Sequence, residues 1–559
     1  MRWPLCAVLA AIACGGPPDG DSDRGVADDT DDTDAPLPTG ATVPAVVTAS
    51  APIACAAPDT RNTSRFELRN APEMPLPSAE LVGGGIVAAD FTGDELLDIF
   101  LMSESDRQFF VQQSDGTFDD VAAAAMGPTD VSAGVGGSAA DYDGDGDLDL
   151  LVTRFDRPVK LLQNDGIGHF TDVTDAAGIG VKSEKWQSSS WGDFDGDGWL
   201  DLVVGAYGAK PEDAFATDQL PGDPKALYRN NGDGTFTDRS DLLPSWVHEA
   251  YTFMTAWYDL NGDSYPELFF VNDFAAWRHS VFLWNRGGVS FEMADSALTG
   301  FQPSIFGMGF AVGDLNGDQL PDSVITSWKD IAVMTTLLQD EPLPNGDPDL
   351  LFLEGAGAAG IYVYPEAPVY QSYGWGADLA DLDNDADLDA LVGYGWWSIY
   401  EFNHVDQPDS LFLNDGTGRF VDASTDPLWD LDDRSATRGV LTADLNRDGW
   451  LDVLKRDLTG PTLLRLAECG AEAWSTVSLR MTGPNTRAIG ARIDLTADGK
   501  TQTRWIESGS RSMYSGGPPE AHFGLGAASL VERIEITWPD GEISRVANQG
   551  VRQHLTITR

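Results

Sequence analysis

The stretch Asp141-Tyr-Asp143-Gly-Asp145-Gly-Asp147-Leu-Asp149 places five carboxylates at alternate positions of a nine-residue segment. Asp and Gly favour turns, so the segment is expected to form a tight loop. The residues that follow, 150–153, are apolar or β-branched, as in a short buried strand. Taken alone, such a loop is compatible with an ordinary Asp/Gly turn or with a cation site.

The same nine-residue pattern occurs seven times, which makes an internal repeat the main organising feature of the chain. The copies start at positions 90, 141, 193, 259, 314, 381 and 444. The intervals of 51, 52, 66, 55, 67 and 63 residues match the length of a four-stranded propeller blade with variable loops. The repeat therefore predicts an all-β fold, a seven-bladed β-propeller.

The spacing of the oxygens in each copy suits calcium, which takes six to eight hard oxygen ligands. Oxygens at positions 1, 3 and 5 of a tight loop converge on one point, a main-chain carbonyl at position 7 adds a ligand, and position 9 closes the site. An EF-hand needs a bidentate Glu at position 12. Position 12 is apolar here, as at Val152 and Val204, so the loops are expected to be calcium sites of a different kind.

About seven Ca2+ sites are therefore predicted, with a ligand from positions 1, 3, 5, 7 and 9 of each loop. The predicted ligands are Asp90, Thr92, Asp94, Leu96, Asp98, Asp141, Asp143, Asp145, Asp147, Asp149, Asp193, Asp195, Asp197, Trp199, Asp201, Asp259, Asn261, Asp263, Tyr265, Glu267, Asp314, Asn316, Asp318, Leu320, Asp322, Asp381, Asp383, Asp385, Asp387, Asp389, Asp444, Asn446, Asp448, Trp450 and Asp452.

A second element follows many of the loops. In the segments 162–170, 228–236 and 413–420, an Asn-Asp-Gly or Asn-Asn-Gly turn precedes a Gly and then a Phe. Asn-Gly and Asp-Gly between apolar runs indicate tight hairpins. The closing Phe is expected to pack between neighbouring blades.

The acidic loops and these hairpins resemble FG-GAP/VCBS repeats, as in integrin α-type propellers, over roughly residues 65–470. The C-terminal segments 485–492, 508–515, 522–526 and 534–541 resemble an ASPIC/UnbV domain. The resemblance implies a propeller at 55–470 and a small β-sandwich-like domain at 471–559. Alternating apolar residues near the C-terminus, as in 531–538, favour strands.

The N-terminus reads as an export signal at 1–14, with Arg2 before a short apolar stretch that is too short to span a bilayer. Small residues precede Cys14, and this resembles a lipoprotein cleavage box in which Cys14 is lipidated. Simple secretion and a misassigned start are the alternatives. We expect the protein to be exported, either as a bacterial outer-membrane lipoprotein or secreted, with membrane contact only through a lipid anchor.

Residues 15–54 are rich in Asp, Pro, Gly, Thr and Ala, and they read as a disordered linker. Beyond the signal, Cys55 and Cys469 flank the repeats. A disulfide between them would join the start of the propeller to its end, because the ends of a propeller must meet. Two unpaired buried thiols are the alternative.

The formal charge of −54 argues against a nucleic-acid partner, whose phosphates such a surface would repel. The six histidines are scattered without a ligand spacing, and no nucleophile or nucleotide motif is found, so no catalytic residue is predicted. Seven near-identical loops favour a structural metal over an active site.

These observations predict a calcium-binding module for adhesion or binding at the cell surface, with an unidentified protein or glycan ligand. The variable stretches 205–225 and 335–350 are candidate binding loops, and Trp277, Trp396 and Trp397 are candidates for stacking on sugars, with core packing as their alternative role. A lyase-like enzyme of polysaccharide breakdown and a purely structural envelope protein are the other readings.

Overall fold

The computed structural model describes residues 40–55, 66–70, 84–102, 108–180, 184–208, 221–274, 278–328, 330–339, 347–362, 373–395, 407–426, 436–457, 462–509 and 511–559, together with the single residues 182, 343, 345 and 429. Three predictions lie outside these ranges: the signal peptide with Cys14, the stacking role of Trp277, Trp396 and Trp397, and most of the variable stretch 205–225. Among the described residues, no helix has the length and apolar character needed to cross a membrane.

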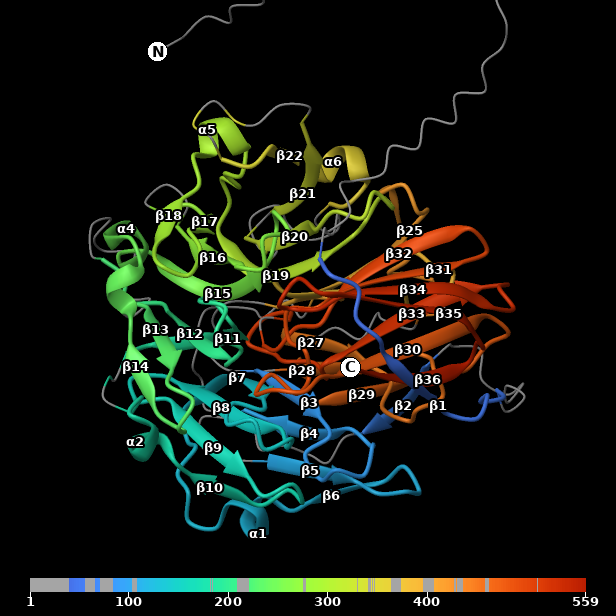
Figure 1. Cartoon of the computed structure of the whole chain (residues 1–559), viewed down its shortest axis with the longest axis horizontal. Coiled ribbons are helices and arrows are strands. Elements are labelled where there is room, and N and C mark those ends of the chain that lie inside the picture. Colours follow the sequence, from blue (N-terminus) through green and yellow to red (C-terminus); the bar gives the residue numbers. More distant parts are fainter. Residues whose placement is uncertain are drawn as a thin grey trace, which may run out of the picture. The chain divides into compact units, whose positions relative to one another are not determined.

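Seven antiparallel four-stranded sheets in the described chain are the blades, and they follow one another along the sequence (Figure 1). Blades 1 to 6 run in simple strand order: β3 (Ile86–Ala89), β4 (Asp98–Leu101), β5 (Gln108–Gln112), β6 (Phe118–Asp120); β7 (Gly134–Ala140), β8 (Asp149–Arg154), β9 (Lys160–Asn164), β10 (Phe170–Asp172); β11 (Trp186–Gly192), β12 (Asp201–Ala206), β13 (Ala226–Asn230), β14 (Phe236–Asp238); β15 (Tyr251–Tyr258), β16 (Glu267–Asp273), β17 (Val281–Asn285), β18 (Phe291–Met293); β19 (Gly307–Gly313), β20 (Asp322–Ser327), β21 (Ile331–Leu338), β22 (Leu350–Glu354); and β23 (Gly374–Ala380), β24 (Asp389–Tyr394), β25 (Ser410–Asn414), β26 (Phe420–Asp422).

Blade 7 closes the ring by combining strands from both ends of the repeat region. Its strands are β27 (Thr437–Ala443), β28 (Asp452–Asp457), β29 (Leu463–Ala467) and, as the outer strand, β2 (Phe66–Asn70). The first strand of each blade lies next to the first strand of the following blade, and β27 lies next to β3. A disulfide joins Cys55 to Cys469 beside this closure, with 5.6 Å between the Cα atoms. The fold is thus an all-β propeller with seven blades.

Short helical turns follow the outer strands of the first five blades: α1 (Ala122–Met126), α2 (Thr174–Ala177), η1 (Ser240–Leu242) with α4 (Ser245–His248), α5 (Ser296–Thr299) and α6 (Ala356–Ala359). The closing aromatic of the hairpin packs between blades, as the sequence predicted. Phe170 of blade 2 contacts Phe91 of blade 1 at 5.5 Å between ring centroids, and Phe236 of blade 3 stacks on Tyr142 of blade 2 at 5.9 Å.

The C-terminal region forms two further four-stranded sheets that share one apolar core. One sheet has the order β1 (Val46–Ala49), β36 (Gln553–Thr558), β30 (Ala473–Arg480), β33 (Glu520–Gly526), and the other has the order β32 (Lys500–Trp505), β31 (Arg492–Ala497), β34 (Val531–Thr537), β35 (Ile543–Gln549).

The predicted linker at 15–54 is wrong for residues 40–54. Strand β1 pairs with β36 in register Val46 to Thr558, so this segment belongs to the C-terminal sandwich. Val43, Ala45 and Val47 pack against the sandwich core. Composition alone missed this strand because a short segment can become ordered by pairing with an existing sheet edge.

The loop between β32 and β33 fills the axis of the propeller, and we call its residues 508–516 the plug. The plug bonds to the inner strands of blades 1, 2, 3, 5 and 7 through Ile86, Gly137, Trp191, Phe310 and Val440. Its Arg511 pairs with Asp378 of blade 6 at 3.2 Å, and its Tyr514 N–H faces the sulfur of Met254 in blade 4. All seven blades therefore contact one segment of the C-terminal domain.

Replacing the Tyr514 side chain is expected to destabilise the whole molecule. Tyr514 is buried to 1% exposure between Phe253 and the inner strands of blades 1 and 2. Truncation to Ala of a buried aromatic of this size costs about 3–5 kcal/mol. Differential scanning calorimetry should show a lower Tm for Tyr514→Ala in one cooperative transition. Tyr362→Ala, at an exposed site, is the control and should leave Tm nearly unchanged. An unchanged Tm in Tyr514→Ala would contradict the role of the plug.

Candidate metal centres

The seven acidic loops occupy equivalent places in the fold, each joining the first to the second strand of its blade. Position 9 is the first residue of the second strand, as Asp98 is in β4 and Asp149 is in β8. The position-1 carboxylate accepts backbone N–H groups from inside the loop. In blade 3, Asp193 Oδ1 accepts from Gly196 and Oδ2 accepts from Gly198, both at 2.8 Å.

All seven loops share one backbone conformation, with a left-handed residue at position 4 and another at position 6. Glycine fills both positions in blades 2 and 3. Six other residues with a Cβ atom are held at positive φ in the remaining loops: Glu95, Ser264, Gln319, Asn384, Ala386 and Arg447. Left-handed backbone costs roughly 1–2 kcal/mol for a non-glycine residue, so the loop shape is kept at a cost to stability.

In three loops the structure brings carboxylates close enough to hold one ion. One oxygen from each member lies within 4.8 Å of the others in the sets Asp141, Asp143, Asp149; Asp193, Asp195, Asp197; and Asp381, Asp383, Asp385. Positions 1, 3 and 5 therefore converge in blades 3 and 6, and positions 1, 3 and 9 converge in blade 2. The spacing predicted such convergence in all seven loops, and calcium binding by these residues stays a prediction.

Three other loops carry an Asn at position 3 in place of a carboxylate. The amide of Asn261 donates to Asp263 at 3.2 Å, that of Asn316 to Asp318 at 2.9 Å, and that of Asn446 to Asp448 at 3.0 Å. Each amide leaves its own oxygen on the loop side, where it accepts the position-5 N–H. These loops keep an oxygen at position 3 with one fewer negative charge. The remaining loop, in blade 1, has Thr92 there.

The position-9 carboxylate also has a structural role that the sequence did not reveal. One of its oxygens accepts the N–H of position 2, and the other accepts an N–H from the third strand of the blade. In blade 3, Asp201 accepts from Phe194 at 3.0 Å and from Asn230 at 2.8 Å. The carboxylate thus ties the loop to its own sheet, and each oxygen has a second lone pair for an ion.

In blades 2, 3, 4 and 6 the hairpin Asn joins the loop to the loop of the preceding blade. Asn230 Nδ2 donates to the Tyr142 carbonyl of blade 2 at 2.8 Å and to the Leu200 carbonyl of its own loop at 3.2 Å. Equivalent bonds to the preceding blade are made by Asn164, Asn285 and Asn414. Gln112 of blade 1 reaches Leu445 of blade 7 at 2.9 Å, so the same bond closes the ring.

The loops hold buried like charges. Burial, with neighbouring carboxylates adding to it, raises the pKa of Asp98 to about 7 and that of Asp141 and Asp193 to about 6. In blade 5, burial raises the pKa of Asp322 to about 8. Desolvation and mutual repulsion both disfavour the ionised state. A divalent cation would remove both effects.

The donor set fits a hard cation. The converging groups are carboxylate, amide and hydroxyl oxygens, which are the ligands calcium prefers. Buried oxygens without a hydrogen-bond partner occur in four of the loops, on Thr92, Asp195, Asn384 and Asp444. Position 7 contributes no converging side chain: the carboxylate of Asp387 instead pairs with Lys500 of the C-terminal domain.

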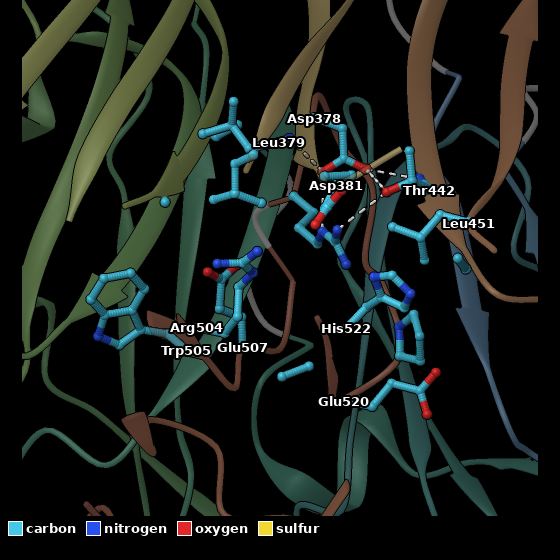
Figure 2. Close-up of a pocket in the computed structure, with 18 of the residues that line it drawn as sticks. Asp378, Leu379, Asp381, Thr442, Leu451, Arg504, Trp505, Glu507, Glu520 and His522 are labelled. Carbon is cyan, nitrogen blue, oxygen red and sulfur yellow. Dashed lines mark hydrogen bonds and ion pairs between the residues drawn. The ribbon is translucent and has the colours of Figure 1, made fainter. Parts of the chain in front are cut away.

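A cavity of about 90 Å³ lies behind the loops of blades 6 and 7. Asp378, Asp381 and Thr442 from the propeller line it on one side, and Arg504 and His522 from the C-terminal domain line it on the other (Figure 2). Its volume corresponds to a few water molecules. His522 Nε2 bonds to the Gly449 carbonyl at 3.0 Å, which gives this histidine a structural contact with the blade 7 loop.

Comparison with known families agrees with this architecture. Models of an FG-GAP-like repeat match residues 90–152, 141–204, 259–325 and 398–454, and a model named ASPIC and UnbV matches residues 481–559. The chain is an FG-GAP repeat protein with a C-terminal ASPIC/UnbV domain. No curated protein matches its sequence.

Solved structures with a similar arrangement share little sequence with this FG-GAP repeat protein. A lectin of Agrocybe aegerita that recognises terminal N-acetylglucosamine is 19% identical, over 62% of this chain and 81% of its own, with a TM-score of 0.37. BBS1N in complex with ARL6DN is 9% identical, over 72% and 97%, with a TM-score of 0.41. YCF48 bound to D1 peptide is 11% identical, over 74% and 97%, with a TM-score of 0.39.

The bond between blades predicts a clear contrast between two adjacent asparagines. In Asn230→Ala, the buried Tyr142 and Leu200 carbonyls lose their donor, which costs about 2 kcal/mol or more. In Asn231→Ala, two exposed bonds are lost, one donated to Thr235 and one accepted from Thr237, so the change should stay below about 0.5 kcal/mol. Urea denaturation of both variants at fixed calcium measures the difference, and equal midpoints would refute the inter-blade role of Asn230.

The raised pKa values predict how the metal-free protein responds to pH. Folding raises the affinity of Asp98, Asp141 and Asp322 for protons, so the folded state binds more protons than the unfolded state between about pH 4 and 8. Its stability should therefore fall as pH rises from 5 to 8. After metal removal and dialysis, thermal melts should show Tm decreasing across this range, and saturating calcium should reduce the slope. A metal-free Tm that rises with pH would contradict the assignment.

Proposed function

We propose that this protein is an exported, calcium-binding propeller that acts as a binding or adhesion module, and that its calcium ions are structural. The observation that carries the proposal is the single backbone conformation of the seven loops, which is kept even where non-glycine residues must adopt positive φ. A loop shape retained at that cost in every blade is best explained by a ligand common to every blade.

The place of the loops supports a structural role for the ions. In blades 1, 2, 3, 5 and 7, hydrogen bonds from the loop's own sheet and from the next blade meet at the loop, as at Tyr142 and Asn230. An ion that fixes positions 1, 3 and 5 would hold this junction. Catalysis would need one such site, whereas the chain has seven equivalent ones.

Export is supported by the apolar N-terminal stretch after Arg2 and by the disulfide between Cys55 and Cys469, since disulfides persist in oxidising compartments. A lipid on Cys14 would attach the folded region to an outer membrane through the polar segment that follows. The bound partner would then be a protein or a glycan at the cell surface.

Calcium removal should lower the stability of the protein. Each ion offsets the repulsion among several buried carboxylates. Ion loss should therefore lower the free energy of unfolding by several kcal/mol and Tm by about ten degrees or more. Atomic emission on the dialysed protein should count about seven calcium ions per chain. Asp383→Ala should remove one of them, while Asp415→Ala, an exposed hairpin carboxylate, should remove none. A Tm unchanged by EDTA would refute structural calcium.

A glycan and matrix-protein array at fixed calcium tests the binding role. Saturable capture of one ligand class without change in that ligand supports the module. Shortened or unsaturated oligosaccharides released from an anionic polysaccharide would instead favour the lyase reading. Absence of both would favour a purely structural envelope protein.

A further inference from the structure

The seven loops differ in how the C-terminal domain covers them. In blades 2, 6 and 7 the position-1 carboxylates Asp141, Asp381 and Asp444 are exposed by only 1–2%. In blades 1, 3 and 4 the equivalent carboxylates are partly exposed; they are Asp90, Asp193 and Asp259. We call the first three the capped loops and the second three the open loops. The loop of blade 5, whose Asp314 is 7% exposed, belongs to neither set.

Residues of the C-terminal domain bond directly to all three capped loops, in blade 7 through His522 and the Gly449 carbonyl. The Thr486 hydroxyl donates to Asp141 Oδ2, and the Arg487 guanidinium donates to the Gly146 carbonyl at 2.7 Å. In blade 6, Lys500 pairs with Asp387, and the Gly526 N–H donates to the Asn384 carbonyl at 2.7 Å.

At two points the C-terminal domain packs tightly against the capped loops of blades 6 and 7. A Cβ atom on Gly524 would lie 2.1 Å from Asp381 Oδ2, and one on Gly449 would lie 1.6 Å from the Trp474 ring. Arg447 of the blade 7 loop also pairs with Glu520 at 2.7 Å. The domain therefore rests on the loop backbone and on the carboxylates themselves.

In blades 3 and 4, two contacts of the C-terminal domain lie at the margins of the open loops. In blade 3, Pro484 lies 3.7 Å from the Cβ position of Gly198, and in blade 4 Ser264 lies near Gly541. Among the described residues, neither contact reaches a position-1 carboxylate. The position-1 carboxylate is therefore shielded from solvent in a capped loop and partly exposed to it in an open loop.

We propose that the ASPIC/UnbV domain caps the ions of blades 2, 6 and 7, and that ion binding in these three loops and docking of the domain stabilise each other. The proposal rests on the calcium role proposed above. Coupling between two binding equilibria is reciprocal, so the domain slows ion loss from the capped loops, and the ions keep the plug in the propeller axis.

Ion release from the full-length protein tests whether the C-terminal domain slows ion loss from the capped loops. The calcium-loaded protein is mixed with excess fluorescent chelator in a stopped-flow instrument. Two classes of ion are expected, and the release rate of the three capped ions should be lower than that of the others by about tenfold or more. Thr486→Val and Lys500→Met should each move one ion from the slow class to the fast class. Thr501→Val, which loses a bond to Thr496 within the same domain, is the control and should leave both classes unchanged.

Hydrogen exchange of residues 506–519 tests whether the ions in the capped loops keep the plug in place. Asp385→Asn removes a position-5 carboxylate from a capped loop, and Asp263→Asn removes the equivalent group from an open loop. The capped-loop variant should raise exchange in the plug by about tenfold, and the open-loop variant should leave it unchanged. A single release rate, or equal effects of the two variants on the plug, would overturn the proposal. Failure to bind calcium at all would instead overturn the calcium role itself.

Discussion

Burial of like-charged carboxylates at the junctions between blades is the constraint on which the rest of the structure depends. A position-9 carboxylate such as Asp201 is wholly buried and bonded at both oxygens. A position-1 carboxylate such as Asp193 curls the loop around itself. These groups organise each junction, yet burial raises their pKa values, so they need a counter-charge at neutral pH.

The same junctions connect local order to the whole ring. The hairpin Asn, or Gln112 in blade 1, links a loop to the loop of the preceding blade. The closing Phe packs on the position-2 residue of that preceding loop. Polar bonding and aromatic packing thus act on the same two segments, and an ion in the loop would stiffen both. The plug adds a contact with every blade from the axis.

Much of this was predictable from the sequence because the repeat is explicit. Loops that start at Asp141 and Asp193 have the spacing and the flanking apolar runs that predict strand, loop, strand, and the structure places their carboxylates together. Asn-Gly and Asp-Gly turns predicted the hairpins. The packing role of Phe170 followed from its place after such a turn.

Other features depend on contacts that spacing does not encode. Strand β1 is only four residues long and becomes ordered because the edge of β36 accepts it. In the sequence, Asn230 is indicated only as a residue of a hairpin turn. The bond from its side-chain amide to the Tyr142 carbonyl exists only once two blades are side by side. The plug, 508–516, carries small and polar residues without an apolar period, so nothing in it indicates the axis of a distant domain. Long-range pairing of this kind is specified by surfaces, not by local pattern.

The most direct test of the central claim is an anomalous-difference map from crystals grown in calcium, with data collected at a wavelength where calcium scatters anomalously. The account predicts a peak within the carboxylates Asp141, Asp143 and Asp149, and a corresponding peak in the loops of blades 3 and 6, with oxygen ligands at about 2.3–2.6 Å. A folded propeller with these loops intact and no peak at any of them would contradict it.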